Sequence, residues 1–231
     1  MAVLTLLSQK PRLRIAVIGA NDGKHGDPLY QLLKGPLAGR VELLLFEPQA
    51  ELIPHLEQNL AFVENKRVFN IAVGEPGEGV LHSIGRAHWA DLQPPYAANW
   101  PLYRAPTGVT SIHKQQLLDL IVKLRPELGP ESVIESVSVP SRPLAAALEA
   151  EGLPPELDVL QVDVEGDDDN VLYSCDLERT RPAVINAETE HLDVQRIRKL
   201  LAHLESAGYF VVALQGEILA LRKSSAVATT S

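Results

Sequence analysis

The sequence RIAVIGANDGKHGDPLY, residues 14–30, predicts a strand, a tight loop and the start of a helix. Ile15 to Ile18 form an apolar run, and the loop that follows holds three glycines. Glycines let the backbone turn sharply and let a ligand approach the main chain closely. Asp27 can cap the next helix, and Pro28 suits its first turn. This order of elements predicts a ligand-binding turn near the start of an α/β domain.

The rest of the chain continues the alternation of short apolar runs with helical patterns, which predicts an α/β fold with a mainly parallel sheet. Buried strands are expected at 14–18, 41–46, 68–73, 157–162 and 183–187. Helices are expected at 28–34, 50–62, 114–124, 144–151, 167–174 and 194–207. Two further apolar runs, 210–214 and 217–221, are joined by Gln215-Gly216 and predict an antiparallel hairpin. The expected fold class is therefore α/β, with a mainly parallel sheet that ends in a hairpin and helices on both faces.

Composition limits the classes of partner. The 231 residues carry a net charge of −9 at pH 7, which argues against nucleic acid and anionic membranes as partners. No apolar run is long enough to span a bilayer. Cys175 is the only cysteine, so a disulfide framework and a cysteine-ligated zinc site are excluded, and a cytoplasmic location fits. We expect a single domain over 1–223 that is a monomer or homodimer, with a flexible tail at 224–231.

Residues 85–135 break the alternation between the third and fourth expected strands. They contain Trp89, Trp100, Tyr96 and Tyr103 together with several prolines. An insertion at this point lies over the carboxyl edge of the sheet, where α/β proteins bind ligands. It therefore predicts a lid or a wall of the substrate site, and the alternative is an ordinary packed excursion with its own small core.

The first loop resembles a dinucleotide fingerprint in which Asn21 replaces the second glycine, between Gly19 and Gly23. Glu47 ends the second strand and is placed to accept the hydroxyls of a ribose. His25 follows Gly23-Lys24 where a phosphate-binding P-loop has Ser or Thr, which argues against that motif. Asn21 crowds the position of a pyrophosphate, so S-adenosylmethionine, which has no phosphates, fits better than a dinucleotide.

Several motifs in order then resemble a known family. These are VIGANDGKHGDPL, LFEPQAELIPHLEQNL, VFNIAVGEPGEGVLHSI, TGVTSI and LDVLQVDVEGDDDNVL followed by RPAVINAETE. Over roughly residues 12–190 the chain resembles the FkbM-type S-adenosylmethionine-dependent methyltransferases. The resemblance implies a Rossmann-like class I methyltransferase fold and methyl transfer, commonly to a hydroxyl on a sugar or natural product. The segment SRPLAA departs from the family pattern, so the resemblance leaves the acceptor open.

The resemblance also implies which residues bind the cofactor. Those expected at its methionine part, ribose and adenine, in chain order, are Gly19, Ala20, Asn21, Gly23, Glu47, Pro48, Asn70, Ala72, Val73 and Asp163. Asp163, at the end of the fourth strand, would face both the methionine part and the acceptor.

A hydroxyl acceptor needs help in losing its proton, from a general base or a metal ion. The expected catalytic residues, at the ends of the fourth and fifth strands, are Asp163, Glu188 and His191. The same three are the candidates for holding a divalent metal, which stays the less favoured alternative. Two other functions remain open: an NAD(P)-dependent oxidoreductase and a non-catalytic binding module with this fold.

Overall fold

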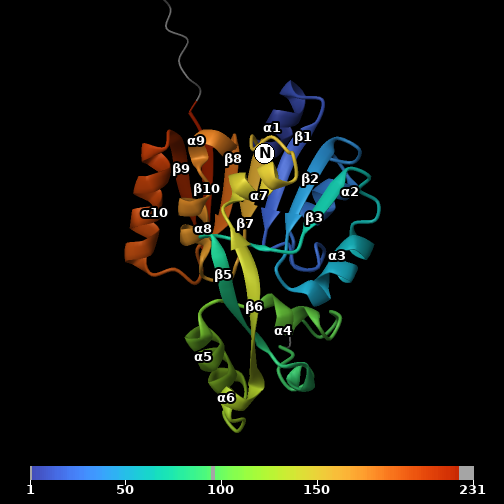
Figure 1. Ribbon diagram of the computed structural model, residues 1–231, viewed down its shortest axis with the longest axis vertical. Helices are drawn as coiled ribbons and strands as arrows, with labels where there is room; N and C mark the ends of the chain where they lie inside the picture. The colour runs from blue at the N-terminus through green and yellow to red at the C-terminus, as the bar shows by residue number, and fades with distance from the viewer. Residues whose placement is uncertain (1, 95–96, 224–231) are drawn as a thin grey trace, which may run out of the picture.

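The computed structural model describes residues 2–94 and 97–223, and the predicted tail at 224–231 lies outside them. The described residues form a large sheet with the strand order β3-β2-β1-β7-β8-β10-β9 (Figure 1). Its strands are β1 (Leu13–Ile18), β2 (Val41–Phe46), β3 (Lys66–Phe69), β7 (Val159–Val162), β8 (Val184–Glu188), β9 (Tyr209–Leu214) and β10 (Glu217–Arg222).

All neighbouring pairs from β3 to β8 are parallel, and β10 is antiparallel to both β8 and β9. The inserted strand β10 therefore runs against the rest of the sheet. This confirms the expected class I methyltransferase fold, mainly parallel and ending in an antiparallel hairpin.

Side chains of the central strands alternate between two hydrophobic clusters, as a strand with both faces covered requires. Ile15 and Val17 pack into one cluster with α1 (Ala2–Gln9), α2 (Leu29–Lys34) and α3 (Ile53–Asn59). Ala16 and Ile18 pack into the other with α7 (Leu144–Ala150), α8 (Asp168–Ser174) and α10 (Val194–Ser206). Helices therefore cover both faces of the sheet, and its carboxyl edge is left for the site.

The strand expected at 68–73 is wrong as a single element. β3 ends at Phe69, and β4 (Ala72–Val73) belongs to a second sheet with the order β4-β6-β5. Its other strands are β5 (Gly77–Ile84) and β6 (Ile134–Arg142), which pair antiparallel over their length. Sequence patterning missed β5 and β6 because both are largely exposed and carry polar side chains where a buried strand is apolar.

The predicted insertion lies between β5 and β6 in the chain and forms the lower lobe in Figure 1. Its helices in the described residues are η2 (Arg86–His88), α4 (Arg104–Gly108), α5 (Lys114–Leu124) and α6 (Pro130–Val133). Ile84, Trp89, Leu92, Ile121 and Val133 pack into a small core of the lobe. Trp89 thus has the packing role that the alternative interpretation gave to the aromatic residues.

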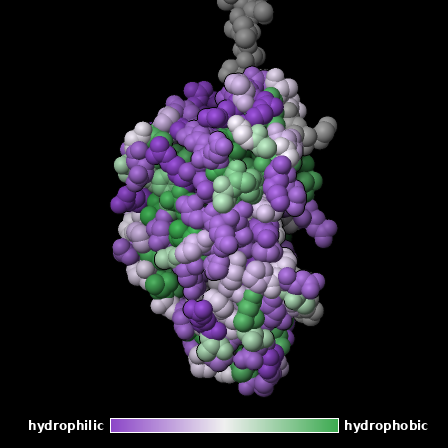
Figure 2. Space-filling model, turned by 90° about the vertical axis from the view of Figure 1, so that its right-hand side faces the viewer, coloured by the Kyte–Doolittle hydropathy of each residue, from purple (hydrophilic) through white to green (hydrophobic). Residues whose placement is uncertain are grey.

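One face of the molecule is largely polar. On the face in Figure 2, hydrophilic side chains cover most of the molecule, and apolar residues occur in separate small patches. No helix among the described residues combines the length and apolarity needed to cross a bilayer.

Candidate functional site

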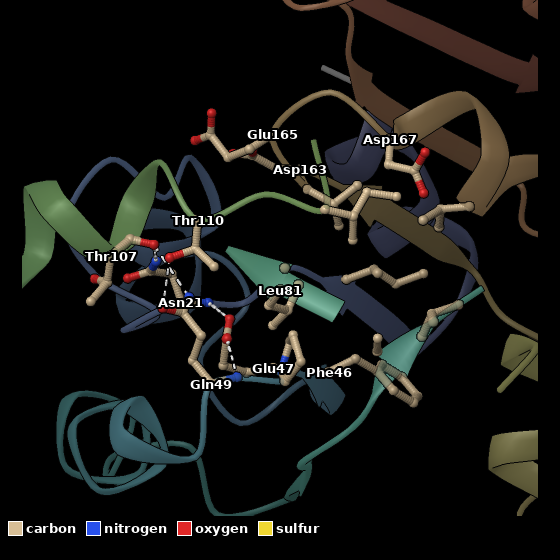
Figure 3. Close-up of a pocket in the computed structure, with 18 of the residues that line it drawn as sticks. Asn21, Phe46, Glu47, Gln49, Leu81, Thr107, Thr110, Asp163, Glu165 and Asp167 are labelled. Carbon is tan, nitrogen blue, oxygen red and sulfur yellow. Dashed lines mark hydrogen bonds between the residues drawn. The ribbon is translucent and has the colours of Figure 1, made fainter. Parts of the chain in front are cut away.

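A cavity lies where the carboxyl ends of β1, β2 and β7 face the lower lobe. It holds about 740 Å³ of empty space, counted out to its open mouth. Phe46, Ile71, Val73 and Leu81 give it an apolar wall. The close-up in Figure 3 shows Glu47 near Asn21 and Gln49 on one side and Asp163 with Glu165 on another. A concave, mainly apolar pocket with a few convergent polar groups is the usual form of a small-molecule site.

Gly19 brings the end of β1 against the end of β7. Its φ is +79°, and a Cβ at this position would lie 1.8 Å from the backbone oxygen of Asp163. Only glycine permits this approach, so the predicted need for a glycine here has a specific cause. Asn21 also has a positive φ, of +45°, which asparagine tolerates better than most residues.

Glu47 is the most deeply buried carboxylate of the cavity wall, with 2% of its surface exposed. Its two carboxylate oxygens accept hydrogen bonds from the backbone N–H groups of Asn21 and Gln49, both at 2.8 Å. Burial disfavours the ionised form and raises the pKa of Glu47 to about 7 despite these bonds. A carboxylate oxygen has more than one lone pair, so Glu47 can still accept bonds from a ligand.

The insertion is hydrogen-bonded to this wall through one backbone carbonyl group. Asn21 Nδ2 and Gln49 Nε2 both donate to the backbone oxygen of Thr107, each at 3.2 Å. Thr110 Oγ1 donates to Gln49 Oε1 at 2.9 Å (Figure 3). The two loops that end β1 and β2 thus hold the end of α4 over the cavity.

A second set of hydrogen bonds between the first loop and the insertion centres on Asp22, which is completely buried. It accepts bonds from the backbone N–H groups of Lys24 and His25, from His25 Nδ1 at 2.6 Å, and from the Tyr103 hydroxyl at 3.2 Å. Burial would raise the pKa of Asp22, but these hydrogen bonds, those from His25 foremost, outweigh it and the pKa is lowered. Asp22 is therefore an ionised anchor between the first loop and the insertion.

A group of carboxylates gathers at the ends of β7 and β8. Burial, with the neighbouring Glu165, raises the pKa of Asp163 to about 6. Burial, with Asp163 and Glu165 nearby, raises the pKa of Glu188 to about 8. Glu188 Oε2 is buried and has no hydrogen-bond partner among the described residues. His191 Nε2 lies 3.1 Å from Glu165 Oε2, and this hydrogen bond raises the pKa of His191 to about 9.

The aspartates that follow have structural contacts. Asp168 is buried and accepts bonds from the backbone N–H groups of Val164 and Gly166, both at 3.3 Å. Burial raises its pKa to about 7. Asp169 pairs with Arg196 of α10. Asp168 therefore fixes the turn between β7 and α8, and the Asp169–Arg196 pair links α8 to α10.

The family model described as the methyltransferase FkbM domain matches residues 18–211. The chain belongs to the FkbM methyltransferase family. This membership confirms the resemblance in the sequence and favours methyl transfer over the nicotinamide alternative.

Several solved methyltransferase structures share the fold at low sequence identity. Human methyltransferase-like protein 13 in complex with SAH is 15% identical with a TM-score of 0.46, over 98% of this chain and 79% of that one. The precorrin-6y C5,15-methyltransferase from Geobacter metallireducens GS-15 is 13% identical with a TM-score of 0.45, over 96% of this chain and 87% of that one. None of the curated proteins matches the chain.

The FkbM motif residues fall into three groups. Those that line the main cavity are Gly19, Asn21, Glu47, Pro48, Ala72, Val73 and Asp163. Ala20 and Gly23 line a smaller adjoining cavity that also reaches Gly19 and Asp163. Asn70 lines neither; its amide donates to the backbone oxygens of Glu47 and Pro48 and so supports the turn after β2.

The candidate catalytic and metal residues are regrouped by the structure. The ligand atoms of Glu188 and His191 lie within 4.8 Å of one another and of Glu165, and Asp163 is not part of that group. Sequence reasoning also missed Gln49, Arg104 and Thr107 at the cavity. Gln49 directly follows the Glu47-Pro48 pair, so its position was readable, whereas nothing in the sequence ties α4 to β1 and β2.

Proposed function

We propose that the protein is an S-adenosylmethionine-dependent methyltransferase that methylates a hydroxyl group of a sugar or natural-product-like metabolite. The observation that carries the proposal is the buried Glu47 at the end of β2, beside an apolar wall and a glycine-containing loop. This arrangement suits a nucleoside, because the carboxylate can accept both ribose hydroxyls and the apolar side chains can pack on the base.

The chain's residues fit the cofactor at both ends. Phe46, Val73 and Leu81 provide the apolar surface that would take the adenine. Gly19 and Asp163 lie where the methionine part would reach. When bound, S-adenosylmethionine supplies a methyl group on a positively charged sulfur. The protein's contribution to rate would be mainly to hold the acceptor oxygen in line with that group.

Glu188 and Asp163 are the proposed general bases. Asp163, with a pKa of about 6, is mostly ionised near pH 7 and can accept a proton there, whereas Glu188, with a pKa of about 8, becomes available as a base as the pH rises toward 8. His191 was predicted as a further base, but its pKa of about 9 keeps the imidazole protonated near pH 7. A protonated His191 has no free lone pair, so its proposed role is to orient Glu165.

A divalent metal, predicted at Asp163, Glu188 and His191, stays the less favoured alternative, and we propose Glu165 in place of Asp163 as a ligand. The spacing of the ligand atoms of Glu165, Glu188 and His191 is compatible with one ion. If methyl transfer continues after exhaustive treatment with a chelator, no metal is needed, and the carboxylates alone would accept the proton of the acceptor hydroxyl.

The first test is binding of S-adenosylhomocysteine by calorimetry to the wild type, Glu47→Gln and Glu64→Gln. Glu47→Gln removes a buried charged acceptor, and loss of charge-assisted bonds of about 1.5–3 kcal/mol predicts a roughly 10- to 100-fold weaker affinity. Glu64 is exposed and away from the cavity, so Glu64→Gln serves as the matched control. Absence of binding to folded wild-type protein would refute the proposal.

The second test addresses the acceptor. The wild type and Glu188→Gln would be incubated with isotopically labelled cofactor and a panel of hydroxylated and amine-bearing metabolites. Label in a hydroxyl that is lost in Glu188→Gln, with cofactor affinity retained, supports the proposed base. Label only on nitrogen would contradict the hydroxyl assignment.

A further inference from the structure

Arg104 is the one lysine or arginine among the described residues that lines the main cavity, and it lines the adjoining one as well. It begins α4 of the insertion. The rest of the cavity's ionisable wall is acidic, with Glu47, Asp163 and Glu165 among its members. A single cation in an acidic pocket marks the place where an anionic group of a ligand is favoured.

The guanidinium of Arg104 lies in a prepared position. A Cβ on Gly108 would come within 2.1 Å of Nη1, and a Cβ on Gly26 within 3.3 Å of Nη2. The group lies over the ring of Trp100, with 5.3 Å from Cζ to the ring centroid. Nε donates to the backbone oxygen of His25 at 2.9 Å and lies 3.6 Å from Asp22. Two glycines, an aromatic ring and one hydrogen bond thus fix its orientation.

The outer nitrogens of Arg104 are available to a ligand. Within the described ranges, neither Nη1 nor Nη2 has a hydrogen-bond acceptor, and neither is sealed from solvent. With Nε already bonded to His25, the pair of Nη atoms remains to donate. Arginine in this state binds carboxylates by two parallel hydrogen bonds.

Asp163 supplies the opposite charge at the same place. Like Arg104, it lines both cavities, and the charge of Arg104 is felt at its carboxyl group, where it favours the ionised form. Gly19 and Asn21 are also shared by the two cavities and lie between the loop and β7. A carboxylate and a guanidinium flanking one space complement the ammonium and carboxylate of a free amino acid.

We propose that Arg104 binds the carboxylate of the methionine part of S-adenosylmethionine while Asp163 faces its ammonium group, an inference that rests on the proposed function. From the sequence, Asp163 was expected to face the methionine part, and no residue of the insertion was assigned to the cofactor. A side chain of the insertion therefore completes the cofactor site, and the insertion recognises the amino-acid end of the cofactor in addition to covering the cavity.

The test compares S-adenosylmethionine with its decarboxylated analogue, which differs only in the carboxylate. Calorimetry would measure both affinities for the wild type, Arg104→Gln, Arg104→Lys and Arg86→Gln. Arg86 lies in the same insertion and also contacts a tryptophan ring, Trp89, but lines neither cavity, which makes Arg86→Gln a matched control.

We expect the wild type and Arg86→Gln to bind S-adenosylmethionine about 10- to 100-fold more tightly than the analogue, which is the range for a charge-assisted pair. In Arg104→Gln the ratio of the two affinities falls to about 1. In Arg104→Lys the ratio is intermediate, because lysine keeps the charge but cannot donate two parallel hydrogen bonds to a carboxylate. A local folding defect would weaken the binding of both ligands by a similar factor, so it cannot by itself bring the affinity ratio down to 1.

Two results would overturn the inference. If Arg104→Gln keeps the wild-type affinity ratio, Arg104 does not bind the cofactor carboxylate. A carboxylate on the acceptor is then the remaining partner of Arg104, and Arg104→Gln would raise the KM for an anionic acceptor. If the wild type binds neither compound, the proposed function fails and this inference with it. The first result leaves the proposed function standing, so the two failures are distinguishable.

Discussion

Replacing Glu47 with glutamine should change how the stability of the protein depends on pH. The pKa of Glu47 is raised from 4.5 to about 7 by burial, which means that the folded state binds a proton that the unfolded state releases in this pH range. A displacement of this size corresponds to about 3 kcal/mol. Because the pKa of the acid is higher in the folded state, its contribution to stability is lost as pH rises from about 4.5 to about 7 and is constant above.

Glutamine has no such titration, but it has one acceptor oxygen where Glu47 has two. One of the backbone N–H groups, of Asn21 or Gln49, would then be left without a partner, at a cost of about 1–3 kcal/mol that does not vary with pH. We therefore expect Glu47→Gln to be less stable than the wild type near pH 5. The free energy of unfolding of the wild type should fall by about 3 kcal/mol relative to that of the variant toward pH 8, where the variant is as stable as the wild type or more stable.

The assay is urea unfolding followed by circular dichroism on ligand-free protein at several pH values, with Glu64→Gln as the control. Asp163, Asp168 and Glu188 also have raised pKa values, but they titrate in both proteins and largely cancel in the difference. A difference between wild type and Glu47→Gln that is independent of pH would refute the assignment of a desolvated, raised-pKa carboxyl group at this position.

Three further predictions test the local geometry. Gly19→Ala should lower the free energy of unfolding in urea by more than about 3 kcal/mol, because the new Cβ would meet backbone atoms. Gly39 also has a positive φ, of +66°, but no atom lies within 4 Å of a Cβ built there, so Gly39→Ala should lose only about 1–2 kcal/mol through backbone strain. Equal losses in the two variants would contradict the close approach at Gly19. Tyr103→Phe removes a hydrogen bond to the buried Asp22 and should lower the free energy of unfolding by about 1–2 kcal/mol, and an unchanged value would show that the hydroxyl does not anchor the insertion. Cys175 is fully buried and its pKa is raised to about 12, so a thiol reagent at pH 8 should leave the folded protein unlabelled and modify it in urea; rapid labelling of the folded protein would be inconsistent with this burial.

Sequence reasoning succeeded where local pattern and burial agree. The central strands are short and apolar because helices cover both faces, and their positions follow from that pattern alone. Gly19 and Glu47 could be placed at the cavity because each ends a strand of a parallel sheet, and parallel strands end at one edge. The terminal hairpin was readable from its turn residues.

The rest depended on contacts between distant parts of the chain. β5 and β6 form an exposed antiparallel pair whose side chains follow no buried pattern, and the sequence therefore gave no reason to separate β4 from β3. Thr107 acts through its backbone oxygen, which no residue type encodes. The grouping of Glu188 and His191 with Glu165 depends on the loop after β7, where Glu165 has a φ of +57°.

Asn21 shows how one departure from a motif can have two causes. In the sequence it counted only against a ligand with phosphates, because its side chain occupies the space that a second glycine leaves open. In the structure that side chain donates to the Thr107 oxygen, while its backbone N–H donates to Glu47. A glycine would preserve the second bond and lose the first. The residue that was predicted to disfavour a pyrophosphate therefore also helps to hold the insertion over the cavity, together with the hydrogen bonds of Asp22 and Arg104.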